Sequence, residues 1–446
     1  MFDPAAESMQ PSERASVQGE RLTSLVRYLH EHVPFYRERL EEAGIKPDED
    51  LSVDDLPRMP VTTKDDLRNN YPFGLLAVPT GELARVHASS GTTGKPTVVA
   101  YTAADLDLFA QVVARCLAMG GARPHMVLHN AYGYGLFTGG LGVHAGAERL
   151  HMAVVPASAG MTERQLTLIS DLKPQVIAAT PSYALTLAQA FRERGISPDA
   201  ISLDYALLGA EPWTESMRAE IDSSLAVRST NLYGLSEIIG PGVAGECVEV
   251  REGSHVNEDH FFPEVVDPGT GEVLADGQEG VLVITTLTKQ ALPLLRYRTG
   301  DITALSRGTC ACGRTLVTMA PVKGRADDML IVRGVNVYPT QVGDILARVP
   351  TFSPHFQLVV TREATLDVLE VRVEVTEEYA RSITAEVLSQ DVIEADHTLR
   401  EQRAQAARLL RETIGLSTTV TLVAPGGTPR SEGGKLQRVE DRRHVS

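Results

Sequence analysis

The sequence contains little cysteine, little positive charge and no long apolar run. Four cysteines in 446 residues exclude a disulfide scaffold. Lysine and arginine total 42 against 58 aspartate and glutamate, a formal net charge of −16, which opposes non-specific binding to nucleic acid or anionic membranes. No run approaches the ~18 apolar residues of a membrane-spanning helix, and the N-terminus lacks the basic and apolar regions of a signal peptide. We therefore expect a cytoplasmic protein without nucleic-acid or membrane partners.

The residue pattern predicts two domains. Hydrophobic residues make up 43% and charged residues 22%, as in ordinary globular proteins. After a helical start, residues 85–265 alternate short β-branched runs with helical segments, which is typical of an α/β fold with largely parallel strands. Residues 247–316 resemble strands and turns. The chain then restarts as a small α+β unit that includes one long helix around residues 389–415. We place the boundary at Asp327, which gives domains 1–326 and 327–446.

The strongest local motif is HASSGTTGKP at residues 87–96. Its backbone N–H groups, hydroxyls and lysine are groups that can wrap a phosphate chain. The segment lacks the spacing of a Walker A loop, and Lys95 is followed by Pro96 rather than by Ser or Thr. A surface loop without a ligand is the alternative for this motif alone. The candidate phosphate-binding residues are Ser90, Gly91, Thr92, Thr93, Gly94 and Lys95.

Four further short motifs follow this loop along the chain. They are YGLSE at 233–237, YRTGD at 297–301, GRADD at 324–328 and a GGK that ends at Lys435. Together with SSGTTGKP they resemble the adenylate-forming superfamily of acyl-CoA synthetases, adenylation domains and luciferases. Longer segments such as NAYGYGLFTGGLG, NEDHFFPEVVDPGTGEVL and DDMLIVRGVNVYPTQ resemble its phenylacetate–CoA ligase branch. The resemblance covers residues 34–441.

This resemblance implies an AMP-forming aryl acid–CoA ligase that uses ATP, magnesium and CoA. Such an enzyme adenylates an aromatic carboxylic acid of the phenylacetate, benzoate or anthranilate type, because a free carboxylate has no good leaving group. It then transfers the acyl group to CoA and releases AMP. The implied fold is a large multi-layer N-terminal α/β domain with a small mobile α+β C-terminal domain. The hinge is implied at Asp327, the boundary that the pattern alone suggested.

Each role that the resemblance implies falls on a residue with suitable chemistry. Glu237 matches the magnesium ligand, with Thr92 as a second contact. Lys435 matches the lysine that bridges the substrate carboxylate and the α-phosphate, and Lys95 supplies positive charge at the phosphates. Asp301 matches the carboxylate that binds the ribose hydroxyls. Besides the phosphate loop, the implied nucleotide-binding residues are Gly209, Ala210, Glu211, Tyr233, Gly234, Asp301 and Arg325.

An aromatic and glycine-rich segment, YGYGLF at residues 132–137, is typical of a narrow slot for a planar acid. The resemblance implies an aryl pocket lined by Tyr134, Phe137, Ala210, Tyr233, Ile238 and Pro241. It also makes residues 333–336 a candidate contact in the thiol-accepting arrangement. Packing in the core is the alternative for each aromatic. The pattern does not separate the three types of aromatic acid.

Three cysteines and one histidine stand on short β connections: Cys247, His255, Cys310 and Cys312. Such a set suits a closed tetrahedral zinc site of the structural kind, and some similar ligases carry such a zinc. Metal-free reduced thiols are the alternative, because the C-x-C spacing is unusual. His260 is the rival fourth ligand. Cys116 is expected to be a small core residue on the buried face of a helix.

Three other functions remain open at the level of sequence. The nearest is a stand-alone adenylation enzyme that loads the phosphopantetheine of a carrier protein. A second transfers AMP to a redox cofactor or another non-acyl acceptor. A third is a regulatory protein that binds nucleotide without turnover, although a binder has no need of Lys435. Similar ligases are often dimers, but no residue here establishes a homodimer.

Overall fold

Helical segments occupy the first eighty residues of the computed structural model, which describes residues 1–89, 96–326, 330–333, 335–363, 366–384, 388–431, 436 and 438–443. α2 buries the face that carries Leu22, Leu25 and Leu29. Pro34 then begins a new helix, because proline fits a first helical turn but not an interior. The segments are α1 (Pro4–Glu7), α2 (Pro11–His32), α3 (Pro34–Glu42), η1 (Val53–Arg58), α4 (Lys64–Asn69) and η2 (Thr80–Glu82).

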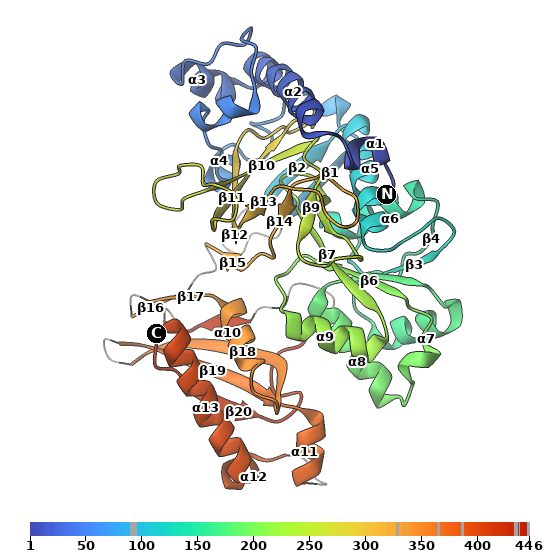
Figure 1. The fold of residues 1–446 in the computed structure, drawn as a ribbon, viewed down its shortest axis with the longest axis vertical. Coiled ribbons are helices and arrows are strands. Elements are labelled where there is room, and N and C mark those ends of the chain that lie inside the picture. Colours follow the sequence, from blue (N-terminus) through green and yellow to red (C-terminus); the bar gives the residue numbers. More distant parts are fainter. Residues whose placement is uncertain are drawn as a thin grey trace.

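A nine-stranded sheet forms the centre of the large part (Figure 1). Its order is β13-β14-β9-β8-β7-β6-β5-β3-β4, and β7, β6, β5, β3 and β4 run parallel, as predicted. The strands are β3 (Val127–Asn130), β4 (Ala153–Val155), β5 (Val176–Ala179), β6 (Tyr205–Gly209), β7 (Arg228–Leu235), β8 (Gly240–Glu246), β9 (Ser254–Val256), β13 (Leu305–Ser306) and β14 (Thr318–Met319).

Helices cover both faces of this sheet. Along β5, Val176 and Ala178 belong to one hydrophobic core, whereas Ile177 and Ala179 belong to another, because successive strand residues point to opposite faces. The first core contains α5 (Ala103–Met119) and α6 (Thr138–Arg149). The second contains α7 (Thr162–Leu172), α8 (Pro181–Glu193) and α9 (Glu215–Leu225), with η3 (Pro198–Ala200) between the last two helices.

Smaller β elements complete the large part. A four-stranded antiparallel sheet has the order β10-β11-β12-β15. Its strands are β10 (Phe261–Val266), β11 (Gly280–Thr286), β12 (Tyr297–Thr303) and β15 (Gly324–Arg325). β1 (Arg85–Ser89) and β2 (Thr97–Tyr101) pair antiparallel with Ser89 opposite Thr97, so the two ends of the predicted phosphate loop are brought together.

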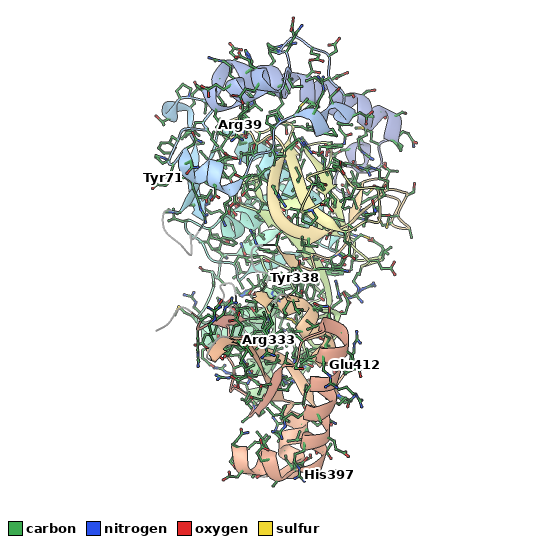
Figure 2. The ribbon with its side chains drawn as sticks, turned by 90° about the vertical axis from the view of Figure 1, so that its left-hand side faces the viewer. Arg39, Tyr71, Arg333, Tyr338, His397 and Glu412 are labelled. Atoms are coloured by element: carbon green, nitrogen blue, oxygen red, sulfur yellow. The ribbon has the colours of Figure 1, made fainter. Side chains whose placement is uncertain are left out.

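Residues 330–443 have a hydrophobic core of their own. A sheet of order β20-β19-β18-β21 packs against helices in the lower part of Figure 1, and Tyr338 lies where the two parts meet (Figure 2). The elements are β16 (Leu330–Val332), β17 (Val335–Val337), α10 (Pro339–Leu346), β18 (Phe352–Glu363), β19 (Leu366–Val375), α11 (Glu377–Ile383), α12 (Gln390–Ala395), α13 (His397–Ile414), β20 (Thr419–Val423) and β21 (Val439–Asp441). A boundary at Asp327 remains a prediction, because that residue lies outside the described ranges.

One predicted element differs from the structure. The long helix expected around residues 389–415 is two helices, α12 and α13, which meet at Asp396. The Asp396 carboxylate accepts a hydrogen bond from the backbone N–H of Leu399 (2.8 Å), which is the role of an N-cap residue. Among the described residues, no helix is long and apolar enough to cross a membrane.

Candidate active site

The polar residues of the site follow the carboxyl ends of parallel strands. Asn130 ends β3, Thr180 follows β5, Ala210 and Glu211 follow β6, and Ser236 and Glu237 follow β7. Carboxyl ends of parallel strands meet at one edge of a sheet, where α/β proteins bind their ligands. Gly209 and Gly234 permit close backbone approach here, since an added Cβ would lie 2.0 Å from the Leu232 carbonyl oxygen or 1.9 Å from that of Gly240.

Tyr233 of the nine-stranded sheet forms one cluster with Asp301 and Arg325 of the four-stranded sheet. The Tyr233 hydroxyl donates a hydrogen bond to Asp301 Oδ2 (2.6 Å). Asp301 pairs with Arg325 across β12 and β15, and its Oδ1 lies 3.8 Å from the Arg325 guanidinium. Burial, and then the neighbouring Asp301 charge, raise the pKa of Tyr233. The tyrosine therefore stays a donor and fixes the carboxylate predicted to bind ribose.

Glu237 is buried and contacts Lys289, a buried lysine that the sequence did not predict at this site. The Lys289 ammonium donates to the Glu237 carbonyl oxygen (3.1 Å) and lies 5.0 Å from the centre of the Tyr101 ring. Burial lowers the pKa of Lys289 to about 8, against the opposing charges of Asp105 and Glu237. The lysine is charged at neutral pH and fixes the turn that carries Glu237. Its only signal in the sequence was its place in the segment TTLTKQALP.

Glu211 joins the two parts of the molecule. One carboxylate oxygen accepts the backbone N–H of Ser182 at the start of α8 (2.7 Å), and the other accepts the backbone N–H of Leu436 (3.0 Å). Leu436 directly follows Lys435 in the chain. The phosphate loop Ser90–Lys95, Lys435 and the hinge residue Asp327 lie outside the described residues, so their roles remain predictions.

Three of the predicted aryl-pocket residues lie at the ends of neighbouring strands. Ala210 directly follows β6, Tyr233 lies near the end of β7, and Pro241 pairs with Gly234 near the start of β8. Tyr134 accepts a hydrogen bond from Asn130 Nδ2 (2.8 Å). Phe137 is exposed, whereas Ile238 is fully buried in the main core.

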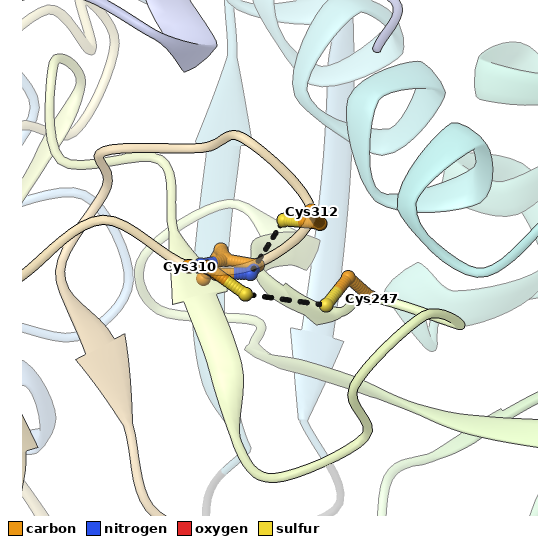
Figure 3. Close-up of side chains that lie close together, drawn as sticks. Cys247, Cys310 and Cys312 are labelled. Carbon is orange, nitrogen blue, oxygen red and sulfur yellow. Dashed lines mark hydrogen bonds between the residues drawn. The ribbon is translucent and has the colours of Figure 1, made fainter.

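The structure brings Cys247, His255, Cys310 and Cys312 together in one cluster, with all four ligand atoms within 4.8 Å of one another. Figure 3 shows the three cysteines converging from two chain segments. The Sγ atoms of Cys247 and Cys310 are 3.8 Å apart, and Cys312 Sγ lies 3.5 Å from His255 Nε2. A disulfide needs ~2.05 Å between its sulfurs, so these thiols are not bonded.

These separations fit a tetrahedral metal ion. Ligands ~2.3 Å from zinc lie about 3.8 Å from one another in a tetrahedron. Burial lowers the pKa of His255 to about 4, so the ring is neutral and keeps a lone pair. His260 lies elsewhere, with Nδ1 2.8 Å from Thr288 Oγ1. Cys116 is buried in the core outside the cluster, and burial raises its thiol pKa to about 12.

Two regions of the chain match known protein families. Residues 27–288 match the AMP-binding enzyme family, and residues 334–443 match the AMP-binding enzyme C-terminal domain. The chain belongs to the adenylate-forming enzymes that share these two regions.

The family within this class follows from relatives of full length. A phenylacetate-coenzyme A ligase of Thermus thermophilus is 61% identical over 443 residues, which span 99% of this chain and 100% of that protein. The chain belongs to the phenylacetate–CoA ligase family. The predicted family, α/β fold class and enzyme class are thereby confirmed.

Two solved structures of one ligase differ in their likeness to this chain. 2-Hydroxyisobutyryl-CoA ligase in the postadenylation state with 2-HIB-AMP has a TM-score of 0.89 at 30% identity. The same ligase in the thioesterification state with 2-HIB-AMP and CoA has a TM-score of 0.71 at 31% identity. Each comparison covers 99% of this chain and 92% of the other.

Proposed function

We propose that this chain activates phenylacetate with ATP and transfers the phenylacetyl group to CoA. A carboxylate oxygen attacks the α-phosphorus of ATP, the bond to the β-phosphate oxygen breaks, and pyrophosphate leaves. The CoA sulfur then attacks the acyl carbon and loses its proton, and the acyl–oxygen bond to AMP breaks. Membership of the phenylacetate–CoA ligase family at 61% identity over full length is the observation that carries the proposal.

The arrangement of charged groups supports this assignment of roles. Asp301, held by Tyr233 and Arg325, takes the ribose hydroxyls. Glu237 directly follows Ser236 at the carboxyl end of β7 and would hold magnesium, which would supply positive charge to the phosphates. Leu436, which follows Lys435 in the chain, is bound to Glu211 at the same edge of the sheet, and this supports the assignment of Lys435 to the α-phosphate.

The Cys247–His255–Cys310–Cys312 cluster holds a structural zinc ion in this proposal. All four positions are occupied by protein ligands, which leaves no place for substrate. Pro241 lies near the start of β8, whereas Cys247 directly follows the end of this strand. Pro241 and Cys247 are six residues apart, so at ~3.3 Å per residue the strand separates the metal cluster from this residue of the aryl pocket by about 20 Å. The zinc therefore stabilises the fold and takes no part in the chemistry.

A panel of acids tests the proposal. Phenylacetate, benzoate, anthranilate and hydroxybenzoates are supplied with ATP and magnesium, each with and without CoA, while pyrophosphate and CoA thioester are measured. We expect phenylacetate to give the largest kcat/KM and a phenylacetyl-CoA product. Preference for another acid would overturn the substrate assignment. Pyrophosphate release without any CoA thioester would favour transfer to a carrier protein.

A further inference from the structure

Glu211 accepts a hydrogen bond from Leu436, which lies 225 residues further along the chain. It follows Ala210, which adopts a left-handed backbone conformation (φ 73°) that side chains other than glycine rarely occupy. This turn points Glu211 toward the start of α8, where Ser182 N–H binds one oxygen. The second oxygen accepts Leu436 N–H, and both partners are main-chain donors.

We propose that Glu211 is a latch that positions Lys435 for adenylation and releases it before thioester formation. The nitrogen of Leu436 is covalently bonded to the carbonyl carbon of Lys435. A hydrogen bond at that nitrogen therefore fixes the main chain directly next to the lysine. This inference rests on the proposed function, because it assigns a positioning residue to the first half-reaction only.

Contacts on both sides of Leu436 bind the same segment to the large part. The Thr186 hydroxyl in α8 lies 3.4 Å from the carbonyl oxygen of Ser431. The Arg438 guanidinium lies 3.5 Å from Met217 Sδ in α9, while its other face packs on the Phe356 ring of the small part. The described residues Ser431 and Arg438 therefore lie close to α8 and α9, and Leu436 between them in the chain binds Glu211.

A carboxylate suits this position better than any neutral group. Each of its two oxygens accepts one N–H, and both hydrogen bonds are strengthened by the negative charge. Glutamine has the same shape but only one oxygen. Its NH₂ group would face one of the two N–H donors, so one hydrogen bond is lost while the packing is retained.

Glu211→Gln is the test variant. Glu215→Gln is the matched control, because Glu215 is an exposed residue of α9. Adenylation is measured as phenylacetate-dependent exchange of pyrophosphate into ATP. Thioester formation is measured separately from supplied phenylacetyl-adenylate and CoA. We expect Glu211→Gln to slow exchange about 10-fold, the loss of one charge-assisted hydrogen bond, and to change the second reaction less than about 2-fold. Glu215→Gln should change neither.

Three results would overturn the latch. Equal slowing of both half-reactions would mean general destabilisation. A higher KM for ATP with unchanged maximal exchange would mean a nucleotide contact. Unchanged exchange would mean that the hydrogen bond has no role in positioning. Absence of both reactions in the unmodified chain would instead overturn the proposed function.

A second measurement does not depend on activity. The rate of trypsin cleavage after Arg438, measured by mass spectrometry of the undigested and cleaved chains, reports on how often the chain around this residue detaches from the large part. Cleavage should be faster in Glu211→Gln than in Glu215→Gln. Equal rates in the two variants would contradict the latch even if Glu211→Gln were inactive.

Discussion

The Tyr233 hydroxyl donates a 2.6 Å hydrogen bond to the Asp301 carboxylate, which belongs to a different sheet. Two motifs separated by 68 residues thus form one unit. The tyrosine contributes a ring beside the predicted aryl pocket and a hydroxyl that orients the predicted ribose-binding group. The two functions of this side chain are separable by substitution.

Tyr233→Phe removes only the hydroxyl. We expect the KM for ATP to rise about 5-fold, because an orienting hydrogen bond to a charged group contributes ~1 kcal/mol or more, while the KM for phenylacetate changes little. Tyr233→Ala should raise both, because the ring is also lost. Steady-state kinetics with each substrate varied in turn check this. Equal effects of both variants on phenylacetate would contradict the separation.

Lys435→Ala should abolish adenylation and leave thioester formation from supplied phenylacetyl-adenylate largely intact. The lysine carries the positive charge that bridges the substrate carboxylate and the α-phosphate, and that charge is needed only while pyrophosphate leaves. Single-turnover assays of each half-reaction provide the measurement. Survival of adenylation would show that another cation serves this step.

Lys289→Met removes the buried ammonium beneath the turn that carries Glu237. We expect the magnesium concentration for half-maximal adenylation to rise about 5-fold, since the carbonyl of Glu237 loses a charge-assisted hydrogen bond. Lys323→Met is the matched control, because Lys323 is exposed and pairs only with surface Glu279 among the contacts described. A magnesium requirement equal in both variants would contradict a positioning role for Lys289.

Metal removal should destabilise the loop of residues 310–315 and the N-terminal segment bound to it. Arg314 Nε donates to Glu7 (2.7 Å), and Arg14 donates to the Thr315 hydroxyl (2.6 Å). We expect one zinc per chain, a loss of zinc in Cys312→Ser, and a melting temperature lower by ~5 °C or more. Elemental analysis and calorimetry measure these quantities. Cys116→Ala should retain zinc, and its loss there would contradict the assigned ligands.

His260 should make the fold sensitive to acid. Burial lowers its pKa to about 4, whereas a histidine in the unfolded chain has a pKa of ~6.5. The unfolded state therefore binds more protons between these values, and stability is present above the unfolded pKa and lost as pH falls toward 4. The charged groups around the ring are Asp3, Arg21, Arg115 and Asp259.

At ~1.4 kcal/mol per pH unit, His260 should lower the free energy of unfolding by about 2 kcal/mol between pH 7 and pH 5. Urea unfolding at pH 7 and pH 5 compares the unmodified chain with His260→Gln. The variant should lose about 2 kcal/mol less between the two conditions. Parallel losses would show that His260 does not titrate as assigned.

The sequence predicted those features that depend on local pattern. Parallel strands followed from the alternation of β-branched runs and helices, and Glu237 followed from the YGLSE motif at the end of one strand. The clustering of Cys247, His255, Cys310 and Cys312 was predictable because Cys310 and Cys312 are neighbours and His255 lies close to Cys247 in the chain.

Contacts that depend on long-range packing were not predictable. Lys289 reaches Glu237 from a segment 52 residues away, and Leu436 reaches Glu211 across 225 residues. The break at Asp396 was also missed, because no glycine or proline marks it. There an aspartate cap replaces the usual signals of a helix end.

We expect an acyl-adenylate to form before CoA takes part in the reaction. Exchange of labelled pyrophosphate into ATP tests it most directly, with phenylacetate and magnesium present and CoA absent. Exchange should be rapid when phenylacetate is present and should stop when the acid is omitted. Exchange that occurs only when CoA is present, or none in either condition while phenylacetyl-CoA still forms, would contradict it.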